Sequence, residues 1–358
     1  MMHIVLSGYF GFHNTGDEAI LYSMIEQLKR IQPNIRITAL SNDPLHTSTT
    51  YDIESVNRWS LPAIFRVIKS ADGVISGGGS LLQDATGPRS IIYYTSVINI
   101  ARLLKKPVFV YSQGMGPIEK RFGKLLTTFT LNHVDRLTVR DEDSKKLLES
   151  MNIRHDIDIV PDPVLGMKVP EEPSKWLLEQ QIDEPIVAIS VRPWKTEKYL
   201  DKIADAADRL RTDGYTILFV PMHGEGDEKS SKEVLKRMRE EAFILPADCT
   251  IQEKLKVVSE SELLIGMRLH SLIFAAVSAV PFIPLSYDPK IASFAALYDV
   301  GPIFHVEHDT WDGDLLYQEV KNIEENRERI MKNSQQLTET YQSQTERTAA
   351  EALEAFSS

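Results

Sequence analysis

The sequence predicts an α/β protein made of two doubly wound domains. Short apolar runs alternate with amphipathic stretches through the first half of the chain, and the same alternation restarts after a polar, proline-rich segment. Strands and helices that alternate in this way form parallel sheets covered by helices. The chain has 358 residues, which is longer than one compact α/β unit usually needs.

The elements of the first half follow from hydrophobic periodicity. Short apolar runs predict buried strands, and longer stretches with apolar residues three and four positions apart predict helices. The expected strands are residues 3–6, 35–40, 73–76, 108–111 and 137–139. The expected helices are residues 18–31, 90–104 and 144–151. Together these elements predict a first domain over residues 1–170.

The second half repeats the pattern after residues 170–174, where two prolines and two glutamates predict an interdomain linker. Expected strands at 186–191, 216–220, 263–265 and 282–285 alternate with expected helices at 198–211, 232–241, 252–260 and 271–279. This pattern predicts a second domain over residues 171–320. From Leu316 onward the chain is charged and amphipathic, and no strand follows. We therefore expect residues 321–358 to form a helix or helix pair that crosses back onto the first domain.

The composition narrows the functional classes. A net charge of −11 argues against a general nucleic-acid binder, because such affinity comes mostly from clustered Lys and Arg that neutralise phosphates. The single cysteine, Cys249, excludes an internal disulfide, and no Cys/His group has zinc spacing, so no metal site is expected. No run of about 18 apolar residues predicts a membrane span. We expect a cytoplasmic protein, with peripheral contact to the inner face of the membrane left open.

An arginine and a histidine two residues apart, Arg268 and His270, follow an apolar strand and precede a small-residue helix. In an extended segment both side chains lie on one side, whereas in a helix they diverge by roughly 200°. We therefore expect the pair on a loop, at the carboxyl end of a strand and the amino end of a helix. Open α/β sheets bind ligands there, and the helix dipole favours an anion. The alternative is a structural salt bridge beside a hydrogen-bonded histidine.

The loop after the first strand contains Gly8, Gly11 and Gly16, and Asp17 and Glu18 open the helix that follows. Glycines let backbone approach a ligand closely, and the first amides of a helix are free to bind one. The glycine spacing differs from the dinucleotide fingerprint, and two acids at the helix start would repel a phosphate placed there. The loop is either a ligand loop or a tight turn whose acids complement the helix dipole.

Two further glycine-rich loops follow expected strands of the same sheet. Residues 76–80 include Gly78 and Gly79, and residues 112–117 include Gln113. Such runs are conformationally costly, which is explained by a substrate close to the backbone or by tight packing of strand on helix. Three loops on one sheet edge outline one crevice.

Basic side chains follow strands in both halves. An ion pair of Arg140 with Asp141 or Asp143 would contribute less than about 1 kcal/mol, and each of the other cations has a similar structural explanation. All would nevertheless line the carboxyl edges of two facing sheets, an arrangement that suits a small, multiply charged anion. The six residues are Arg140, Arg192, His223, Arg268, His270 and Lys290.

With these residues assembled, the chain resembles the polysaccharide pyruvyl transferases. The features that carry the resemblance run in family order over about residues 1–300. It is most similar to the bacterial branch that pyruvylates N-acetylmannosamine in secondary cell-wall polymers. The motifs are Gly8-Tyr9-Phe10-Gly11 with Asn14-Thr15-Gly16-Asp17-Glu18, Gly77-Gly78-Gly79-Ser80, Gln113-Gly114-Met115-Gly116-Pro117, Val139-Arg140-Asp141 and Arg268-Leu269-His270-Ser271.

The resemblance implies two facing Rossmann-like domains in the GT-B-like arrangement of glycosyltransferases, with the acceptor on the first and the donor on the second. Phosphoenolpyruvate would be the co-substrate, without a further cofactor, and a lipid-linked saccharide would be the acceptor, in cell-wall biogenesis and S-layer anchoring. Family positions assign donor binding to Arg140, Arg268, Leu269 and His270, and position alone adds Arg192 and His223. The expected acceptor-binding residues are Gly11, Asn14, Gly16, Gly78, Gly79 and Gln113.

The chemistry of ketal formation requires a general acid near the donor's methylene carbon. His270 is the first candidate and Lys290 the second, because a protonated His270 could serve only to stabilise phosphate charge. Asp17 or Glu18 would act as base on the acceptor hydroxyl. The arginines can neutralise the leaving phosphate, so no metal is required.

Two other functions remain open on the sequence. A sugar-nucleotide glycosyltransferase of the same architecture would use the cations of the second domain for a diphosphate, although no acidic pair is obviously placed to hold a ribose. A non-catalytic saccharide- or anion-binding protein would use the same residues without turnover.

Overall fold

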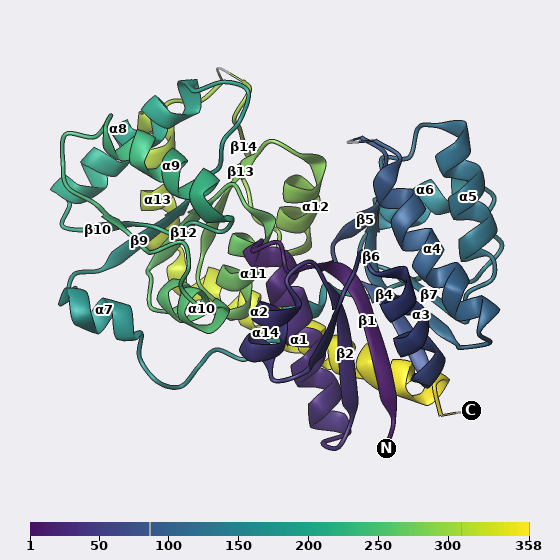
Figure 1. Ribbon diagram of the computed structural model, residues 1–358. Coiled ribbons are helices and arrows are strands. Elements are labelled where there is room, and N and C mark those ends of the chain that lie inside the picture. The colour runs from purple at the N-terminus through teal and green to yellow at the C-terminus, as the bar shows by residue number, and fades with distance from the viewer. Residues whose placement is uncertain (86, 309, 358) are drawn as a thin grey trace. The chain divides into compact units, whose positions relative to one another are not determined.

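The computed structural model describes residues 1–85, 87–308 and 310–357 (Figure 1). The chain divides into two compact units. Unit 1 comprises Met1–Gly166 together with the described residues from Tyr341 onward, and unit 2 comprises Met167–Thr340. The division therefore falls after Gly166, slightly before the expected boundary at residue 170.

Unit 1 is built on a parallel sheet in the order β3-β2-β1-β4-β6-β7-β8, with β5 paired to β6. Its strands are β1 His3–Phe10, β2 Arg36–Ser41, β3 Glu54–Asn57, β4 Gly73–Gly77, β5 Ser80–Leu82, β6 Val108–Met115, β7 Arg136–Val139 and β8 Asp158–Ile159. Its helices are α1 Thr15–Ile31, α2 Pro44–Tyr51, α3 Leu61–Ser70, α4 Arg89–Leu103, α5 Arg121–Leu131 and α6 Glu142–Ser150, and a 3₁₀ turn spans Pro163–Gly166.

The apolar runs that predicted strands form the centre of this sheet. The side chains of Val5 in β1, Val74 in β4 and Val110 in β6 are fully buried. Helices cover both faces of a parallel sheet, so its central strands are apolar at every position, and this continuous apolar run is what predicted them. The polar strand β3 and the two-residue strand β8 carry no such run, and the sequence analysis missed both.

Unit 2 repeats the design with a parallel sheet in the order β11-β10-β9-β12-β13-β14. Its strands are β9 Ile186–Ser190, β10 Thr216–Phe219, β11 Phe243–Ile244, β12 Leu263–Gly266, β13 Phe282–Ser286 and β14 Phe304–His305. Its helices are α7 Lys175–Gln180, α8 Lys198–Thr212, α9 Gly224–Leu235, α10 Ile251–Ser259, α11 Leu269–Val277, α12 Pro289–Leu297, α13 Gly313–Glu325 and the first part of α14 Arg327–Ala355. The predicted fold class, an α/β protein with two parallel-sheet, Rossmann-like parts, is confirmed.

The prediction for the helix between β10 and β11 was wrong. It spans Gly224–Leu235, whereas the sequence suggested 232–241. Two glycines and several charged residues in its first turns hide the apolar period that a sequence reading depends on. As a result, Asp227 lies in the first turns of a helix and not on a loop.

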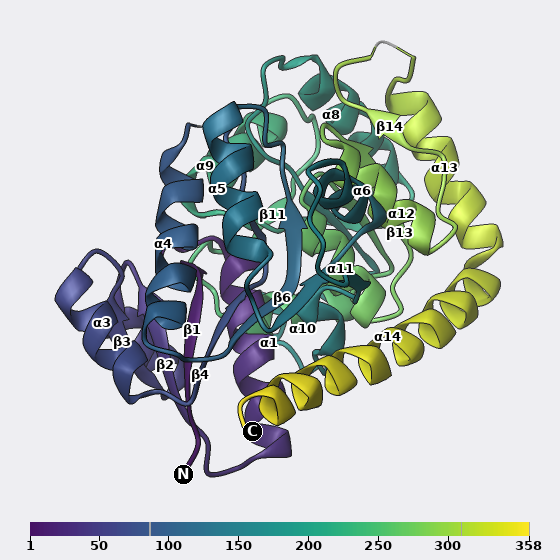
Figure 2. The same ribbon diagram turned by 90° about the vertical axis from the view of Figure 1, so that its right-hand side faces the viewer.

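The C-terminal segment is a pair of helices, α13 and α14, of which α14 is the long yellow helix of Figure 2. The part of α14 after Thr340 belongs to unit 1, so the expected return to the first domain is confirmed. There Ala352, Leu353 and Phe356 are buried, and Arg30 of α1 pairs with Glu346 at 2.7 Å. Within the described ranges, no helix is long and apolar enough to cross a membrane.

Candidate functional site

The carboxyl edge of the first sheet carries the site residues predicted in the first half. Because β1, β4, β6 and β7 are parallel, the loops that follow them meet at one edge. These loops hold residues 11–14, 78–79 and Arg140, Gly16 lies in the first turn of α1, and Gln113 lies near the end of β6. The structure therefore brings this part of the predicted set together.

Arg140 follows β7 directly, and its side chain is only 8% exposed. The guanidinium donates hydrogen bonds to Asp162 at 3.3 Å and to the hydroxyl of Ser80 at 3.0 Å, and its Nε lies 3.5 Å from a carboxylate oxygen of Asp141. It lies against Gly114, where a Cβ would come within 2.9 Å of two guanidinium nitrogens. A bound anion would therefore share Arg140 with two carboxylates.

Glu18 stabilises the loop between β1 and α1. Its buried carboxylate accepts hydrogen bonds from the backbone N–H of Gly11 at 2.8 Å and from the hydroxyl of Tyr51 at 2.8 Å. Burial, followed by the charge of Glu18, raises the pKa of Tyr51. Because each oxygen of Glu18 already accepts a hydrogen bond, Glu18 holds the loop after β1 in place.

Asp17 lies in the first turn of α1, which Asn14 caps by accepting a hydrogen bond from the N–H of Gly16 at 3.1 Å. The backbone of Gly79 has a φ of +73°, and a Cβ there would come within 2.7 Å of an Asp17 carboxylate oxygen. Glycine is needed at this position for its positive φ and for this close approach. Asp17 thus reaches the loop after β4.

Two predicted acceptor residues are covered in this conformation. Gly78 is buried against Ile20 of α1, so its lack of a side chain serves the packing of β4 on that helix. The side chain of Gln113 is fully buried, and its amide forms no hydrogen bond with any residue that the structure describes. Direct contact with an acceptor is therefore not supported at either position, because neighbouring atoms exclude it.

The sequence analysis missed Arg58, which follows β3 at the same sheet edge. Arg58 is 3% exposed and donates to the carbonyl of Gly8 at 2.9 Å and to the hydroxyl of Tyr94 at 3.1 Å. No carboxylate in the described part of the chain pairs with it. Five aromatic rings surround the guanidinium, with centroids 4.2 to 6.0 Å away, an arrangement that stabilises a cation. They belong to Tyr9, Phe12, Trp59, Tyr93 and Tyr94.

The carboxyl edge of the second sheet is organised by a buried ion pair between Arg268 and Asp227. Arg268 is the residue before α11, two positions after β12 ends, and Asp227 lies in the first turns of α9. The Nε and Nη2 of Arg268 donate to the two Asp227 oxygens at 2.9 and 2.5 Å. Asp227 is fully buried, whereas the Arg268 side chain is 16% exposed. The structural salt bridge that the sequence analysis gave as the alternative is therefore present. It uses the Nε and Nη2 edge of the guanidinium, and the edge with Nη1 does not face Asp227.

The expectation that Arg268 and His270 share a loop was wrong. Leu269 begins α11, so His270 lies in the first turn of this helix while Arg268 remains extended before it. Leu269, Leu272 and Ile273 are buried. Because Leu269 packs in the core together with the two later residues, the helix begins at Leu269 rather than at Ser271. His270 nevertheless stays at the amino end of α11, where helix amides and dipole favour an anion.

Two further basic side chains lie near Asp227. His223 is the residue before α9, and burial, followed by the charge of Arg268, lowers its pKa. Lys254 of α10 is buried and donates to the carbonyl of Ala247 at 2.8 Å, and burial lowers its pKa to about 8. The buried carboxylate of Asp227 interacts electrostatically with both side chains, a cluster that the sequence analysis did not predict.

Arg192 and Lys290 meet at the ring of Tyr287. Arg192 follows β9, and its guanidinium lies 4.4 Å from the Tyr287 centroid. Lys290 is the second residue of α12, its Nζ lies 5.9 Å from the same centroid, and it pairs with Asp288 at 3.3 Å. The structure therefore places all the predicted cations of the second half at ends of adjacent parallel strands, which share the carboxyl edge of this sheet.

Residues 14–289 match the polysaccharide pyruvyl transferase family. The chain belongs to this family. A curated relative, the amylovoran biosynthesis protein AmsJ of Erwinia amylovora, is 24% identical over 195 residues. That match covers 42% of this chain and 46% of AmsJ, so it spans less than half the length of the relative.

Solved structures of similar fold include several proteins of nucleotide-sugar chemistry. A UDP-N-acetylglucosamine 2-epimerase homologue from Listeria monocytogenes matches with a TM-score of 0.65 and 14% identity over 94% of this chain and 91% of that chain. HepE of Anabaena, in complex with UDP-glucose, matches with a TM-score of 0.63 and 13% identity over 99% and 100% of the two chains. A glycosyltransferase from Rickettsia africae matches with a TM-score of 0.64 and 14% identity, over 99% of this chain and 97% of that chain. At these identities the likeness concerns the fold alone.

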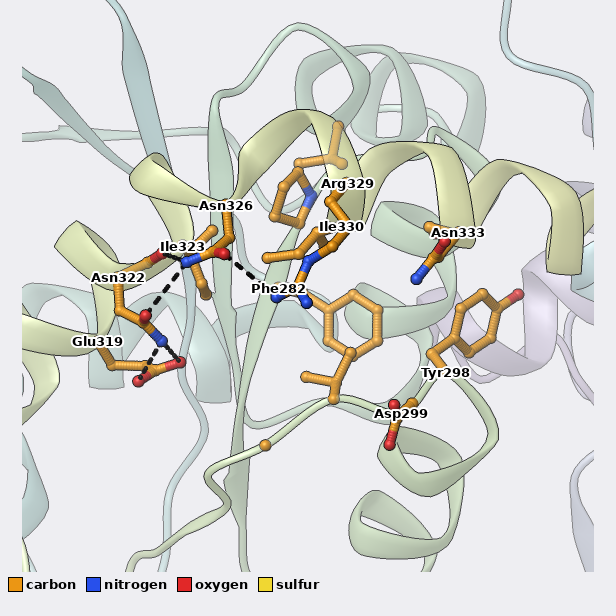
Figure 3. Close-up of a pocket in the computed structure, with 15 residues that line it drawn as sticks. Phe282, Tyr298, Asp299, Glu319, Asn322, Ile323, Asn326, Arg329, Ile330 and Asn333 are labelled. Atoms are coloured by element: carbon orange, nitrogen blue, oxygen red, sulfur yellow. Dashed lines mark hydrogen bonds between the residues drawn. The ribbon is translucent and has the colours of Figure 1, made fainter.

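A pocket of about 210 Å³ in unit 2 lies away from these residues (Figure 3). It opens at Phe282, the first residue of β13, and hence at the amino edge of the sheet. A chain of side-chain hydrogen bonds runs from Arg329 through Asn326 and Asn322 to Glu319 along it. None of the predicted site residues lines this pocket. Among the residues described, no group of three or more His, Cys, Asp or Glu is arranged to hold a metal.

Proposed function

We propose that this transferase moves the pyruvyl group of phosphoenolpyruvate onto two hydroxyls of a saccharide as a ketal and releases phosphate. The acceptor that we propose is an N-acetylmannosamine-containing saccharide carried on a lipid diphosphate, a precursor of a cell-wall polymer. Family membership and the similarity to a polysaccharide biosynthesis protein support transfer to a polysaccharide precursor.

The observation that carries the proposal is the orientation of Arg268. Two of its donors are held by the buried Asp227, which fixes the guanidinium plane at the amino end of α11. The remaining donors and the helix amides suit a phosphate or a carboxylate. Phosphoenolpyruvate carries both groups, and Arg192 beside Tyr287 supplies a further cation at the neighbouring strand end. These features support a small anion that carries both a phosphate and a carboxylate as the donor substrate.

The reaction needs one proton on the methylene carbon of the donor. After that proton adds, an acceptor hydroxyl attacks the cationic carbon, the bond to the phosphate oxygen breaks, and a second hydroxyl closes the ketal. The two hydroxyls release two protons, of which one restores the acid and the other leaves with phosphate. We assign the acid role first to His270, which lies beside Arg268, and second to Lys290. We assign the base role to Asp17, whose carboxylate lies beside Gly79 in the loop after β4, and a structural role to Glu18, which binds Gly11 and Tyr51.

Features of unit 1 support saccharide binding at its carboxyl edge. Tyr9 and Phe12 are stacked with ring centroids 4.0 Å apart, and Trp59 is largely exposed. Aromatic faces offer apolar surface to the C–H face of a sugar ring, while Asp17 provides an acceptor for its hydroxyls. We therefore propose that Tyr9, Phe12 and Trp59 contribute to the acceptor site, in addition to Gly11, Asn14, Gly16 and Gly79.

The proposal is tested by incubating the purified protein with phosphoenolpyruvate and a synthetic N-acetylmannosamine-containing diphospho-disaccharide. Phosphate release and the mass of the saccharide are followed together. We expect phosphate release that depends on the acceptor, with a mass gain of one pyruvyl ketal. Arg268→Ala is expected to lower turnover at least about 100-fold. Arg209→Ala, which removes an exposed ion-paired arginine of α8 in the same unit, is the matched control and should leave turnover unchanged.

Other outcomes assign other functions. Binding of a nucleotide sugar without binding of phosphoenolpyruvate would identify a sugar-nucleotide glycosyltransferase instead. Donor binding without phosphate release from any saccharide offered would indicate a non-catalytic binding protein. Near-normal turnover in folded Arg268→Ala would remove this arginine from the mechanism.

A further inference from the structure

Large exposed apolar side chains gather on three neighbouring helices of unit 1. Helices α3, α4 and α5 pack side by side on one face of the first sheet (Figure 1). Leu103 is 81% exposed and Leu125 is 72% exposed, and the others are more than one-third exposed. We call these seven residues the apolar face: Leu61 and Phe65 of α3, Ile92 and Leu103 of α4, and Phe122, Leu125 and Phe129 of α5.

The segment that carries the apolar face is strongly basic in an acidic protein. Residues 55–134 contain ten basic residues (Lys or Arg) and only three acidic ones (Asp or Glu). The whole chain, in contrast, contains 40 basic and 51 acidic residues. Two of the three acids are engaged, because Asp72 accepts from the N–H of His3 and Asp84 accepts from the N–H groups of Glu119 and Lys120. The charge around the apolar face is therefore positive.

These cations are not neutralised by ion pairs. Exposed basic residues border the apolar face on all three helices, and none of them forms an ion pair with a residue in the described ranges. Arg102 lies over the ring of Phe129 at 5.6 Å, so even this partly buried cation stays beside the apolar surface. The exposed basic residues are Arg66, Lys69, Arg89, Lys105, Lys120, Arg121 and Lys124.

We propose that the apolar face and its basic border dock on an anionic bilayer surface. Apolar side chains that enter the headgroup region, with Lys and Arg beside them, are the chemistry of interfacial membrane binding. Each Lys or Arg near an anionic leaflet adds attraction, which salt screens. A second copy of the chain fits this face less well, because two such surfaces would bring like charges together.

Docking through the apolar face would also bring the carboxyl edge of the first sheet near the membrane surface. Helix α5 begins shortly after β6 ends, at the same edge as Asp17 and Arg140. The saccharide of a lipid-linked acceptor lies at the membrane surface, so this edge would meet it there. That consequence rests on the proposed function, whereas the docking itself does not.

The test is flotation of the full-length protein with vesicles, without any substrate. One set of vesicles contains phosphatidylcholine alone, and the other contains phosphatidylcholine with phosphatidylglycerol. We expect binding to the anionic vesicles that weakens as salt increases, and little binding to the neutral ones. A Phe122→Ser, Leu125→Ser variant and a Lys120→Glu, Lys124→Glu variant should each lose at least about tenfold in vesicle affinity.

Matched controls come from unit 2. Leu178→Ser removes an exposed leucine of α7, and Lys229→Glu reverses an exposed lysine of α9. Both controls should bind vesicles like the parent protein, and circular dichroism checks that all variants are folded. Equal binding of parent and Phe122→Ser, Leu125→Ser protein, or equal binding to both vesicle types, would overturn the proposal. A concentration-dependent dimer that this variant abolishes would instead assign the face to a second copy.

Discussion

Replacing Asp227 with asparagine removes the charge that orients Arg268 while leaving the shape of the side chain unchanged. Asp227 accepts three hydrogen bonds, from Arg268 Nε at 2.9 Å, from Arg268 Nη2 at 2.5 Å and from the backbone N–H of Met222 at 3.2 Å. An asparagine has one acceptor oxygen, and its amide nitrogen must face a donor, so at least one charge-assisted hydrogen bond is lost. Such a bond contributes about 1.5–3 kcal/mol, and complete loss of a buried partner costs about 3–5 kcal/mol.

We therefore expect Asp227→Asn to lower the free energy of unfolding by about 2 kcal/mol. We also expect the dissociation constant of phosphoenolpyruvate to rise at least about tenfold, because the Arg268 fork is no longer held in one plane. Denaturant unfolding and titration calorimetry with the donor measure the two effects. A fully buried side chain does not touch substrate, so Asp227 is a positioning residue.

Two comparisons separate positioning from mere stability. Asp213→Asn removes a carboxylate of the same unit that pairs with Lys321 at 2.8 Å near the surface, and it should leave donor affinity unchanged. Asp227→Glu keeps the charge and should restore part of the donor affinity lost in Asp227→Asn. Unchanged donor affinity in folded Asp227→Asn would refute the reasoning and leave the pair a purely structural one.

The remaining predictions concern the acid, the base and a buried lysine. His270→Ala should lower turnover at least about 100-fold in the folded protein. His305→Ala on β14 is the control and should leave turnover unchanged. Normal turnover in His270→Ala would assign the acid role to Lys290. Asp17→Asn should reduce the maximal rate with little effect on the unfolding temperature, whereas Glu18→Gln should lower that temperature by destabilising the loop after β1. Initial rates and thermal melts measure the two effects. The reverse pattern would make Glu18 the base and Asp17 the structural residue. Burial lowers the pKa of Lys254 to about 8 from 10.5, so the unfolded chain holds this proton more tightly and the native protein gains stability as pH rises from about 8 to 10.5. Lys254→Met should therefore be more stable by about 3 kcal/mol at pH 7, with a difference that shrinks as the pH rises from about 8 to 10.5. A difference in unfolding free energy that does not change with pH would contradict this.

Much of the fold follows from local patterns. The strands with continuous apolar runs, such as Ile186–Ser190 and Phe282–Ser286, were predicted within one or two residues, because a strand covered on both faces must be apolar throughout. The short edge strands Phe243–Ile244 and Phe304–His305 were missed, since two residues carry no period. Helix α9 was misplaced because glycines and charges hide its apolar face.

The sequence by itself determined which residues reach the carboxyl edges of the two sheets. A cation or glycine directly after an apolar strand lies at that edge whatever its neighbours are, as Arg140 and Arg268 do. It also determined the charge asymmetry of residues 55–134, which needs only counting.

Only the tertiary structure decided what those residues touch. Arg268 and Asp227 are 41 positions apart, and the aromatic rings around Arg58 come from β1, α4 and the loops after β1 and β3. Hydrophobic periodicity reports whether a position is buried, not which partner shares its burial, because the partner comes from another part of the chain. For the same reason Asp17 and Glu18, adjacent and alike in sequence, differ in the structure: packing commits the carboxylate of Glu18 to Gly11 and Tyr51 and leaves that of Asp17 beside Gly79.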